Sequence, residues 1–310
     1  MSVAADHYRQ YRERGGVVDL SDRLKLRLTG GDRVRFLNGQ VTANVTRLVA
    51  GQALPGCVTT AKGKLCGDVM LHAANDALIL DADATLRAVL PARLERYIIA
   101  DEVILEDVTD DLRLIHLLGA VAPSAELADV AVCVDRAHRF GRAGWDLILR
   151  SEVMANRWPA LAANAVELDP ELQEILRIEA GVPRWGHELT ENTLPPEAGL
   201  DRTHVDYHKG CYIGQEVISR LKSVGHVNRE LTGFVAVTGA PTVGARLFAP
   251  GDDEHPIGTL TSVAYSFALE KPIALGYLKR GAGFPELIAR SADSTGPETI
   301  VAPHALPIVP

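Results

Sequence analysis

The stretch "DYHKGCYIGQEVISRLK", Asp206 to Lys222, is the most informative part of this sequence for fold and function. Its "GCYIGQE" core combines two glycines, a cysteine and a polar pair, a composition typical of a functional loop, and "QEVISRLK" after Gly214 predicts a short helix. A helix N-terminus and the ammonium of Lys209 both favour a thiolate, so Cys211 is a candidate reactive cysteine. The alternative is that Cys211 is an apolar filler, since free cysteine is among the most buried residue types.

The composition is that of a soluble globular protein of two or three domains. The 310 residues are 47% hydrophobic and 23% charged, enough to bury a sizeable core. The 32 basic and 40 acidic residues give a net charge of −8, which disfavours nucleic acid and anionic membrane surfaces as partners. The N-terminus lacks the apolar core of a signal peptide and no segment is long enough to span a bilayer, so we expect a cytoplasmic protein.

Neither cysteine nor histidine spacing indicates a metal or a disulfide. The four cysteines include no C-x-x-C pair, which predicts neither a disulfide framework nor a zinc ribbon. The histidines include no H-E-x-x-H pattern, so we expect no metal site.

Helical and strand periodicities alternate along the first two thirds of the chain without strict βαβ order, which predicts an α+β fold. The alternating residues 24–28 predict a strand. Apolar residues at helical spacing predict a helix over 34–48. A second helix is expected over about 84–100, kinked or split by Pro91. Asp169 as N-cap and Gly181 as terminator predict a further helix between them.

From residue 227 onward the sequence changes to short apolar runs separated by Gly, Pro and Asp. Such runs predict a small β-barrel or sandwich. We therefore expect an α+β region over residues 1–226 and a C-terminal β-domain over residues 227–310.

The loop "KGCYIGQE" resembles the signature K-G-C-Y-x-G-Q-E of the folate-binding YgfZ-type family, relatives of the glycine-cleavage aminomethyltransferase (T-protein). Three further blocks resemble that family in the same order along the chain. They are "VVDLSDRLKLRLTGGDRVRFLNGQVTANVTRL" (17–48), "LRIEAGVPRWGHELTENTLPPEAGLD" (176–201) and "HPIGTLTSVAYS" (255–266).

The resemblance implies intertwined ferredoxin-like α+β subdomains followed by a small β-barrel, together surrounding a channel for tetrahydrofolate. It implies that Cys211, with Lys209 and Tyr212 beside it, is the reactive centre. It also implies that Glu197 holds the pterin ring, and a carboxylate can indeed accept the paired donors of a pterin in bidentate fashion.

Five further residues are candidates for the folate site. Trp185 is close enough to Glu197 in sequence to line the channel. Arg229, like Arg220 and Lys222, is a cation that could hold the glutamyl tail. Asp68 stands where the T-protein has an acidic pair, although a lone aspartate at the start of a strand is more often a turn or capping residue.

Two departures from the T-protein favour an accessory role over aminomethyl transfer: Gly67 replaces one acidic residue, and Cys211 enters the signature. The first hypothesis is a tetrahydrofolate-binding factor that assembles or repairs iron–sulfur clusters, with client iron–sulfur enzymes or assembly proteins as partners. The alternative is a tetrahydrofolate-dependent aminomethyltransferase. A third is a folate-independent interaction protein on an inherited scaffold.

Overall fold

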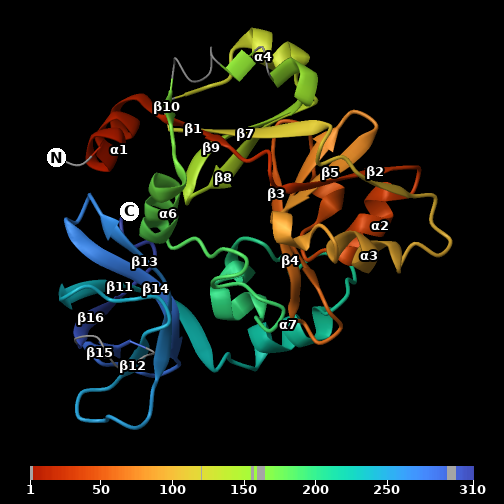
Figure 1. The fold of residues 1–310 in the computed structure, drawn as a ribbon. Coiled ribbons are helices and arrows are strands. Elements are labelled where there is room, and N and C mark those ends of the chain that lie inside the picture. Colours follow the sequence, from red (N-terminus) through yellow and green to blue (C-terminus); the bar gives the residue numbers. More distant parts are fainter. Residues whose placement is uncertain (1–2, 120, 155–156, 159–164, 292–297) are drawn as a thin grey trace.

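The structure is a computed structural model that describes residues 3–119, 121–154, 157–158, 165–291 and 298–310. Two five-stranded sheets and a closed six-stranded barrel make up the molecule, with helices packed on and between them (Figure 1). Among these residues, no helix is long and apolar enough to cross a membrane.

The two sheets are interwoven along the chain. The first has the order β10-β1-β7-β9-β8 and the second the order β3-β4-β5-β2-β6. In the first sheet the bounds are β1 Gly16–Asp19, β7 Leu112–Leu118, β8 Cys133–Arg139, β9 Arg142–Arg150 and β10 Val166–Glu167. In the second they are β2 Leu24–Thr29, β3 Leu54–Thr59, β4 Leu65–Ala74, β5 Ala77–Ala82 and β6 Ile104–Asp107. Strand β1 lies between β10 and β7 in the first sheet. The five strands that separate β1 from β7 in the sequence, β2 to β6, form the second sheet, so the two sheets are intertwined as expected.

The helices contact different parts of the molecule. Their bounds are α1 Val3–Arg14, α2 Arg33–Gln40, α3 Leu90–Glu95, α4 Ala125–Val130, α6 Pro170–Ala180 and α7 Gln215–Ser223. Helices α2 and α3 pack on one face of the second sheet, whereas α6 packs against the barrel strands β13 (Gly258–Ser266) and β14 (Lys271–Lys279) and α7 against the 3-10 turn η3 (Pro195–Ala198). Phe36 and Leu37 of α2 and Leu90 and Leu94 of α3 share one core with the apolar face of the second sheet. Because side chains alternate along a strand, the opposite face of β4 is left to contact β8 of the first sheet.

The predicted helix ending at Gly181 is confirmed, with the Asp169 carboxylate accepting from the Leu172 amide at 2.8 Å and Gly181 left-handed at φ 72°. The helix predicted over 34–48 is wrong beyond Gln40, because the chain turns extended at Val41.

The helix predicted over 84–100 is split, one of the two expected effects of Pro91, and it ends earlier than expected. Only the 3-10 turn η2 (Ala84–Leu86) and the short α3 form there. Pro91 lies in the first turn of α3, where its missing amide hydrogen costs nothing, so it starts a helix instead of kinking one.

The C-terminal barrel is confirmed. Its strand order is β11-β14-β13-β12-β15-β16. The bounds are β11 Arg229–Thr238, β12 Arg246–Phe248, β13 Gly258–Ser266, β14 Lys271–Lys279, β15 Leu287–Arg290 and β16 Thr299–His304. Helix α6 links it to the sheets: the Glu179 carboxylate accepts from the Tyr8 hydroxyl at 2.9 Å and from the Ser266 hydroxyl at 2.5 Å.

The two glycines of the signature differ in what they require. Gly214 has φ 89°, and a Cβ there would lie 2.5 Å from the Thr60 carbonyl oxygen. A Cβ on Gly210 would meet nothing within 4 Å. We predict that Gly214→Ala lowers the free energy of unfolding by about 1–3 kcal/mol, while the control Gly210→Ala changes it little. Urea denaturation of both variants tests this, and equal losses would contradict it.

Candidate functional site

The signature loop is anchored by Lys209. Its Nζ donates to the carbonyl oxygens of Asn38 at 2.6 Å, Val41 at 2.7 Å and Ala43 at 2.6 Å. These carbonyls belong to the segment where α2 ends and the chain turns extended. An ammonium has three hydrogens, so all of its donors are used. The side chain therefore ties the signature loop to a segment far away in sequence.

Lys209 and Cys211 point into different environments. Lys209 is buried, whereas Cys211 is exposed, so the apolar-filler alternative for Cys211 is wrong. Burial lowers the pKa of Lys209 to about 8, and the three carbonyl acceptors, which favour the charged form, oppose that shift. In the described part of the chain no hydrogen bond joins the ammonium to the Cys211 thiol, so the structure gives Lys209 an anchoring position.

Asp68 lies on the inner face of β4. It pairs with Cys57 of β3 inside the strand, so the turn or capping alternative is wrong. A Cβ on Gly67 would lie 2.9 Å from Leu86 Cδ1, in the apolar core under α3. Of the two positions of the expected acidic pair, only residue 68 therefore faces away from that core. Burial raises the pKa of the Asp68 carboxyl, with Arg23 opposing the effect.

Three buried polar atoms near this strand have no hydrogen-bond partner among the described residues: Asp68 Oδ1 and the hydroxyls of Tyr207 and Tyr212. Tyr212 lies close enough to Tyr207 and Cys57 to interact electrostatically, and Cys57 does the same with Asp68. Burial raises the pKa of both tyrosines, that of Tyr207 to about 12. Buried polar groups are nearly always paired, so this row indicates a place for a ligand or ordered water.

Glu197 and Arg229, both expected to contact folate, contact each other. Glu197 Oε2 accepts from the Leu194 amide and from Arg229 Nη2, both at 3.1 Å. The Arg229 guanidinium also stacks 4.3 Å from the centroid of the Tyr277 ring. Glu197 thus keeps one carboxylate oxygen, Oε1, with no partner among the described residues, and a ligand could use it.

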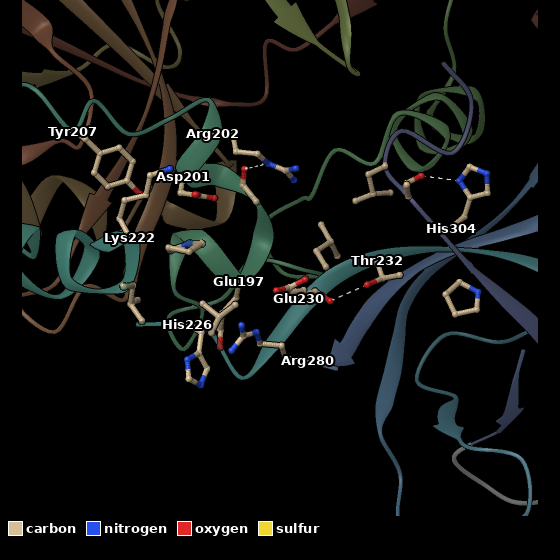
Figure 2. Close-up of a pocket in the computed structure, with 18 residues that line it drawn as sticks. Glu197, Asp201, Arg202, Tyr207, Lys222, His226, Glu230, Thr232, Arg280 and His304 are labelled. Atoms are coloured by element: carbon tan, nitrogen blue, oxygen red, sulfur yellow. Dashed lines mark hydrogen bonds between the residues drawn. The ribbon is translucent and has the colours of Figure 1, made fainter. Parts of the chain in front are cut away.

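A hollow of about 710 Å³ lies between the α+β part and the barrel (Figure 2). It is bordered by η3 (Pro195–Ala198), η4 (Leu200–Arg202), α7 and β11. Glu197 and Tyr207 line it, and the Lys222 ammonium at its wall lies 5.2 Å from the Tyr207 ring centroid. This volume is in the usual range for sites of small organic ligands.

The remaining expected residues lie outside that lining. The expected residues that do not border the hollow are Asp68, Trp185, Lys209, Cys211, Tyr212, Arg220 and Arg229. Trp185 packs against a buried cluster. The members of that cluster are Cys57, Leu65, Leu189, Ala198 and Leu200. Tyr207 borders the hollow and Tyr212 does not; the two rings are close enough for Tyr207 to contribute to the raised pKa of Tyr212, whose main cause is burial.

The sequence prediction missed two features. Tyr207 lies in the opening stretch, where its position two residues before Lys209 was the only available signal. The buried polar cluster centred on His72 gave no local signal, since its members come from separate strands.

Comparison with known proteins shows which families and structures this chain resembles. The family model described as "GCVT N-terminal domain" matches residues 1–125, and "Glycine cleavage T-protein C-terminal barrel domain" matches residues 229–295. The aminomethyltransferase of Streptomyces avermitilis is 25% identical, with 97% of this chain and 88% of the relative covered. That of Saccharopolyspora erythraea is 27% identical, with 98% and 89% covered. The crystal structure of the glycine cleavage system aminomethyltransferase T from Bartonella henselae matches with a TM-score of 0.83 at 20% identity, covering 99% and 89% of the two chains.

The fold is therefore T-protein-like, with mixed helices and sheets and a closed six-stranded C-terminal barrel. The chain carries the N-terminal and the C-terminal barrel domains of the glycine-cleavage T-protein architecture.

We predict that Lys209→Met lowers the free energy of unfolding by about 3 kcal/mol, because three carbonyls would lose their shared donor inside the protein. The control Lys222→Met removes an exposed ammonium whose contact within the described residues is with the face of the Tyr207 ring, and we expect a loss below about 1 kcal/mol. Urea denaturation measures both, and a mild Lys209→Met variant would disprove the anchoring role.

Burial lowers the pKa of His204 from 6.5 to about 4. In the pH range between these values the unfolded chain binds a proton that the native imidazole does not, so this contribution to stability is present above pH 6.5 and is lost as the pH falls toward 4. We predict that His204→Gln weakens the fall in stability between pH 7 and pH 5, measured by urea denaturation at both values. The exposed His226, changed to Gln, is the control, and parallel pH profiles for wild type and His204→Gln would refute the prediction.

Proposed function

We propose that this chain binds tetrahydrofolate and transfers an aminomethyl or related one-carbon group to it, as a T-protein-like transferase. The similarity to proteins named aminomethyltransferase extends over nearly the whole chain. The observation that carries the proposal is the Asp68 carboxyl, which faces the interior from β4 with one buried oxygen unpaired. This ranks transfer chemistry above the accessory role that the sequence favoured.

The candidate site offers the contacts that a reduced folate needs. Glu197 Oε1, at the hollow, can accept hydrogen bonds from the amino group and ring N–H of a pterin, and a carboxylate makes such bonds strong. The unpaired hydroxyls of Tyr207 and Tyr212 provide further donors and acceptors. Arg229 already neutralises Glu197, so we assign it to holding this carboxylate in place instead of binding the glutamyl tail.

Asp68 is the group we assign to proton transfer. Burial raises its pKa, which brings a carboxyl closer to neutral pH, where an acid–base catalyst works best. When the aminomethyl carbon passes from its thioether carrier to folate, two carbon–nitrogen bonds to folate form while the carbon–sulfur bond to the carrier and the carbon–nitrogen bond to ammonia break. The two protons that the folate nitrogens lose leave on the carrier thiol and on ammonia. A single enclosed carboxyl can accept a proton from a folate nitrogen and return it to a leaving group.

The test separates binding from transfer. We predict that Glu197→Gln weakens tetrahydrofolate binding about 10-fold or more, since one charged hydrogen-bond acceptor becomes neutral. We predict that Asp68→Asn keeps binding but slows turnover of an aminomethyl-lipoyl carrier about 10²–10⁴-fold. Calorimetry and ammonia release measure these effects, with Asp76→Asn in the exposed β4–β5 turn as control. Absence of any thermal shift with tetrahydrofolate would overturn the proposal and favour the folate-independent scaffold.

A folate-binding accessory role for iron–sulfur enzymes is the second candidate. The observation that favours it is the exposure of Cys211, whereas Cys57 and Cys133 are buried and Cys66 is partly so. An exposed thiol can reach a protein partner. For this role Cys211→Ala would leave tetrahydrofolate binding and aminomethyl transfer intact while client enzyme activity in cells falls. Unchanged clients would remove this candidate without affecting the first.

A further inference from the structure

A buried group of His, Cys and Asp side chains lies where the two sheets meet. His72 comes from β4 of the second sheet, and Cys133 and Asp135 come from β8 of the first. One ligand atom from each of the three lies within 4.8 Å of the others, and all three residues are buried. The His72 Nδ1 atom is 2.9 Å from Asp135 Oδ2.

The carboxylates on the two sides of the His72 ring differ in whether a cationic side chain neutralises them. On the Nε2 side, Asp81 Oδ2 lies at 3.1 Å and Asp146 Oδ2 at 3.8 Å. Arg139 Nη2 bridges these two carboxylates at 2.7 and 2.8 Å. This side already holds a cation built into the chain, so a metal ion there would have to displace a guanidinium.

On the Nδ1 side, where His72 faces Asp135 and Cys133, the polar groups are joined by hydrogen atoms and not by a charged side chain such as Arg139. Carboxylate oxygens only accept hydrogen bonds, so the two ring nitrogens that face Asp135 and Asp81 must both carry hydrogen in the metal-free protein. The Cys133 thiol likewise hydrogen-bonds to Asp135. An imidazole nitrogen, a sulfur and a carboxylate oxygen therefore converge with two exchangeable protons between them.

We propose that His72 Nδ1, Cys133 Sγ and an Asp135 carboxylate oxygen form a binding site for a divalent cation of the zinc type. Zinc takes these three ligand types at about 2.0–2.3 Å, so tetrahedral ligands lie about 3.5 Å apart. The three ligand atoms lie within 4.8 Å of one another, so a bound ion requires His72 Nδ1 and Asp135 Oδ2, now 2.9 Å apart, to separate slightly. Three protein ligands leave one of the four zinc positions open.

Charge balance supports the exchange. One divalent cation enters while one proton leaves the imidazole and one leaves the thiol, so the formal charge of the buried cluster does not change. The Nε2–H of His72 still donates to Asp81, and Arg23 and Arg139 hold that carboxylate in place. A metal-bound histidine oriented by a carboxylate is the usual outer arrangement of such sites.

The consequence is a link between the two sheets that is independent of folate. It also runs against the sequence-based expectation of no metal. That expectation used local spacing, and these ligands lie on two strands that are distant in the sequence.

Cobalt(II) is the probe, because a cobalt–thiolate bond absorbs in the near ultraviolet. Chelator-treated protein titrated with Co²⁺ should develop this band with one equivalent, and Zn²⁺ should abolish it. Cys133→Ala should remove the band, and Asp135→Asn should weaken Co²⁺ binding at least 10-fold. The matched controls, Cys57→Ala at a buried thiol and Cys211→Ala at the exposed one, should keep both the absorption band and the Co²⁺ affinity of the wild type.

Absence of the band in wild-type protein would overturn the proposal, and so would a band that survives Cys133→Ala or disappears in Cys211→Ala. Circular dichroism confirms that each variant is folded. If Cys133→Ala does not fold, Asp135→Asn and the two cysteine controls decide the outcome. Zn²⁺ should also raise the melting temperature of wild type but not of Asp135→Asn.

Discussion

The candidate site depends on one buried ammonium group. Lys209 donates to three carbonyls at the end of α2, and each of these would otherwise be a buried acceptor without a partner, at a cost of about 1–3 kcal/mol. Backbone bonds on either side, from the Asp206 amide to the Thr42 carbonyl and from Ile213 to Gly39, fix both ends of the loop. Tyr207 and Tyr212 flank this anchor, so their hydroxyls are held in place without being paired. A site held in this way is organised before a ligand arrives, which reduces the entropy lost on binding.

Strand β4 supplies one residue to the proposed folate site and one to the buried cluster between the sheets. Its residues alternate between two environments: Val69 and Leu71 enter the core under α2 and α3, while Asp68 and His72 face the other way. The same alternation thus supplies the carboxyl of the proposed folate site and the imidazole of the buried cluster between the sheets. Burying charges in that cluster is tolerable because Arg139 lies between two of its carboxylates; removing one partner of such a set would leave an uncompensated buried charge.

The sequence predicted elements whose signals are local. Helix α6 has its own N-cap and terminating glycine, and the barrel strands are separated by turn residues. Helix α7 follows Gly214, whose positive φ favours glycine. Helix 34–48 failed because the carbonyls of Val41 and Ala43 bond to Lys209, far away along the chain. The site followed the same rule. Cys211 and Glu197 were proposed from their motifs, but the inward direction of Lys209 and the pairing of Glu197 with Arg229 depend on contacts that no local pattern encodes. The convergence of His72, Cys133 and Asp135 depends on the register of two sheets.

The ranking of transfer above accessory chemistry follows from these contacts. The sequence argument for a reactive Cys211 used two sources of positive charge, the start of α7 and the Lys209 ammonium. The ammonium is committed to three carbonyls, and the first turn of α7 carries the acidic Glu216, so both sources are weakened. Asp68 is better placed for chemistry than Cys211. Its carboxyl is enclosed, burial raises its pKa, and its Oδ1 atom has no hydrogen-bond partner among the described residues, so it can act on a ligand. A carboxyl of this kind suits proton movement on an enclosed substrate, whereas an exposed thiol suits contact with a partner. The two residues therefore support different steps, and the enclosed one is the better candidate for chemistry on folate.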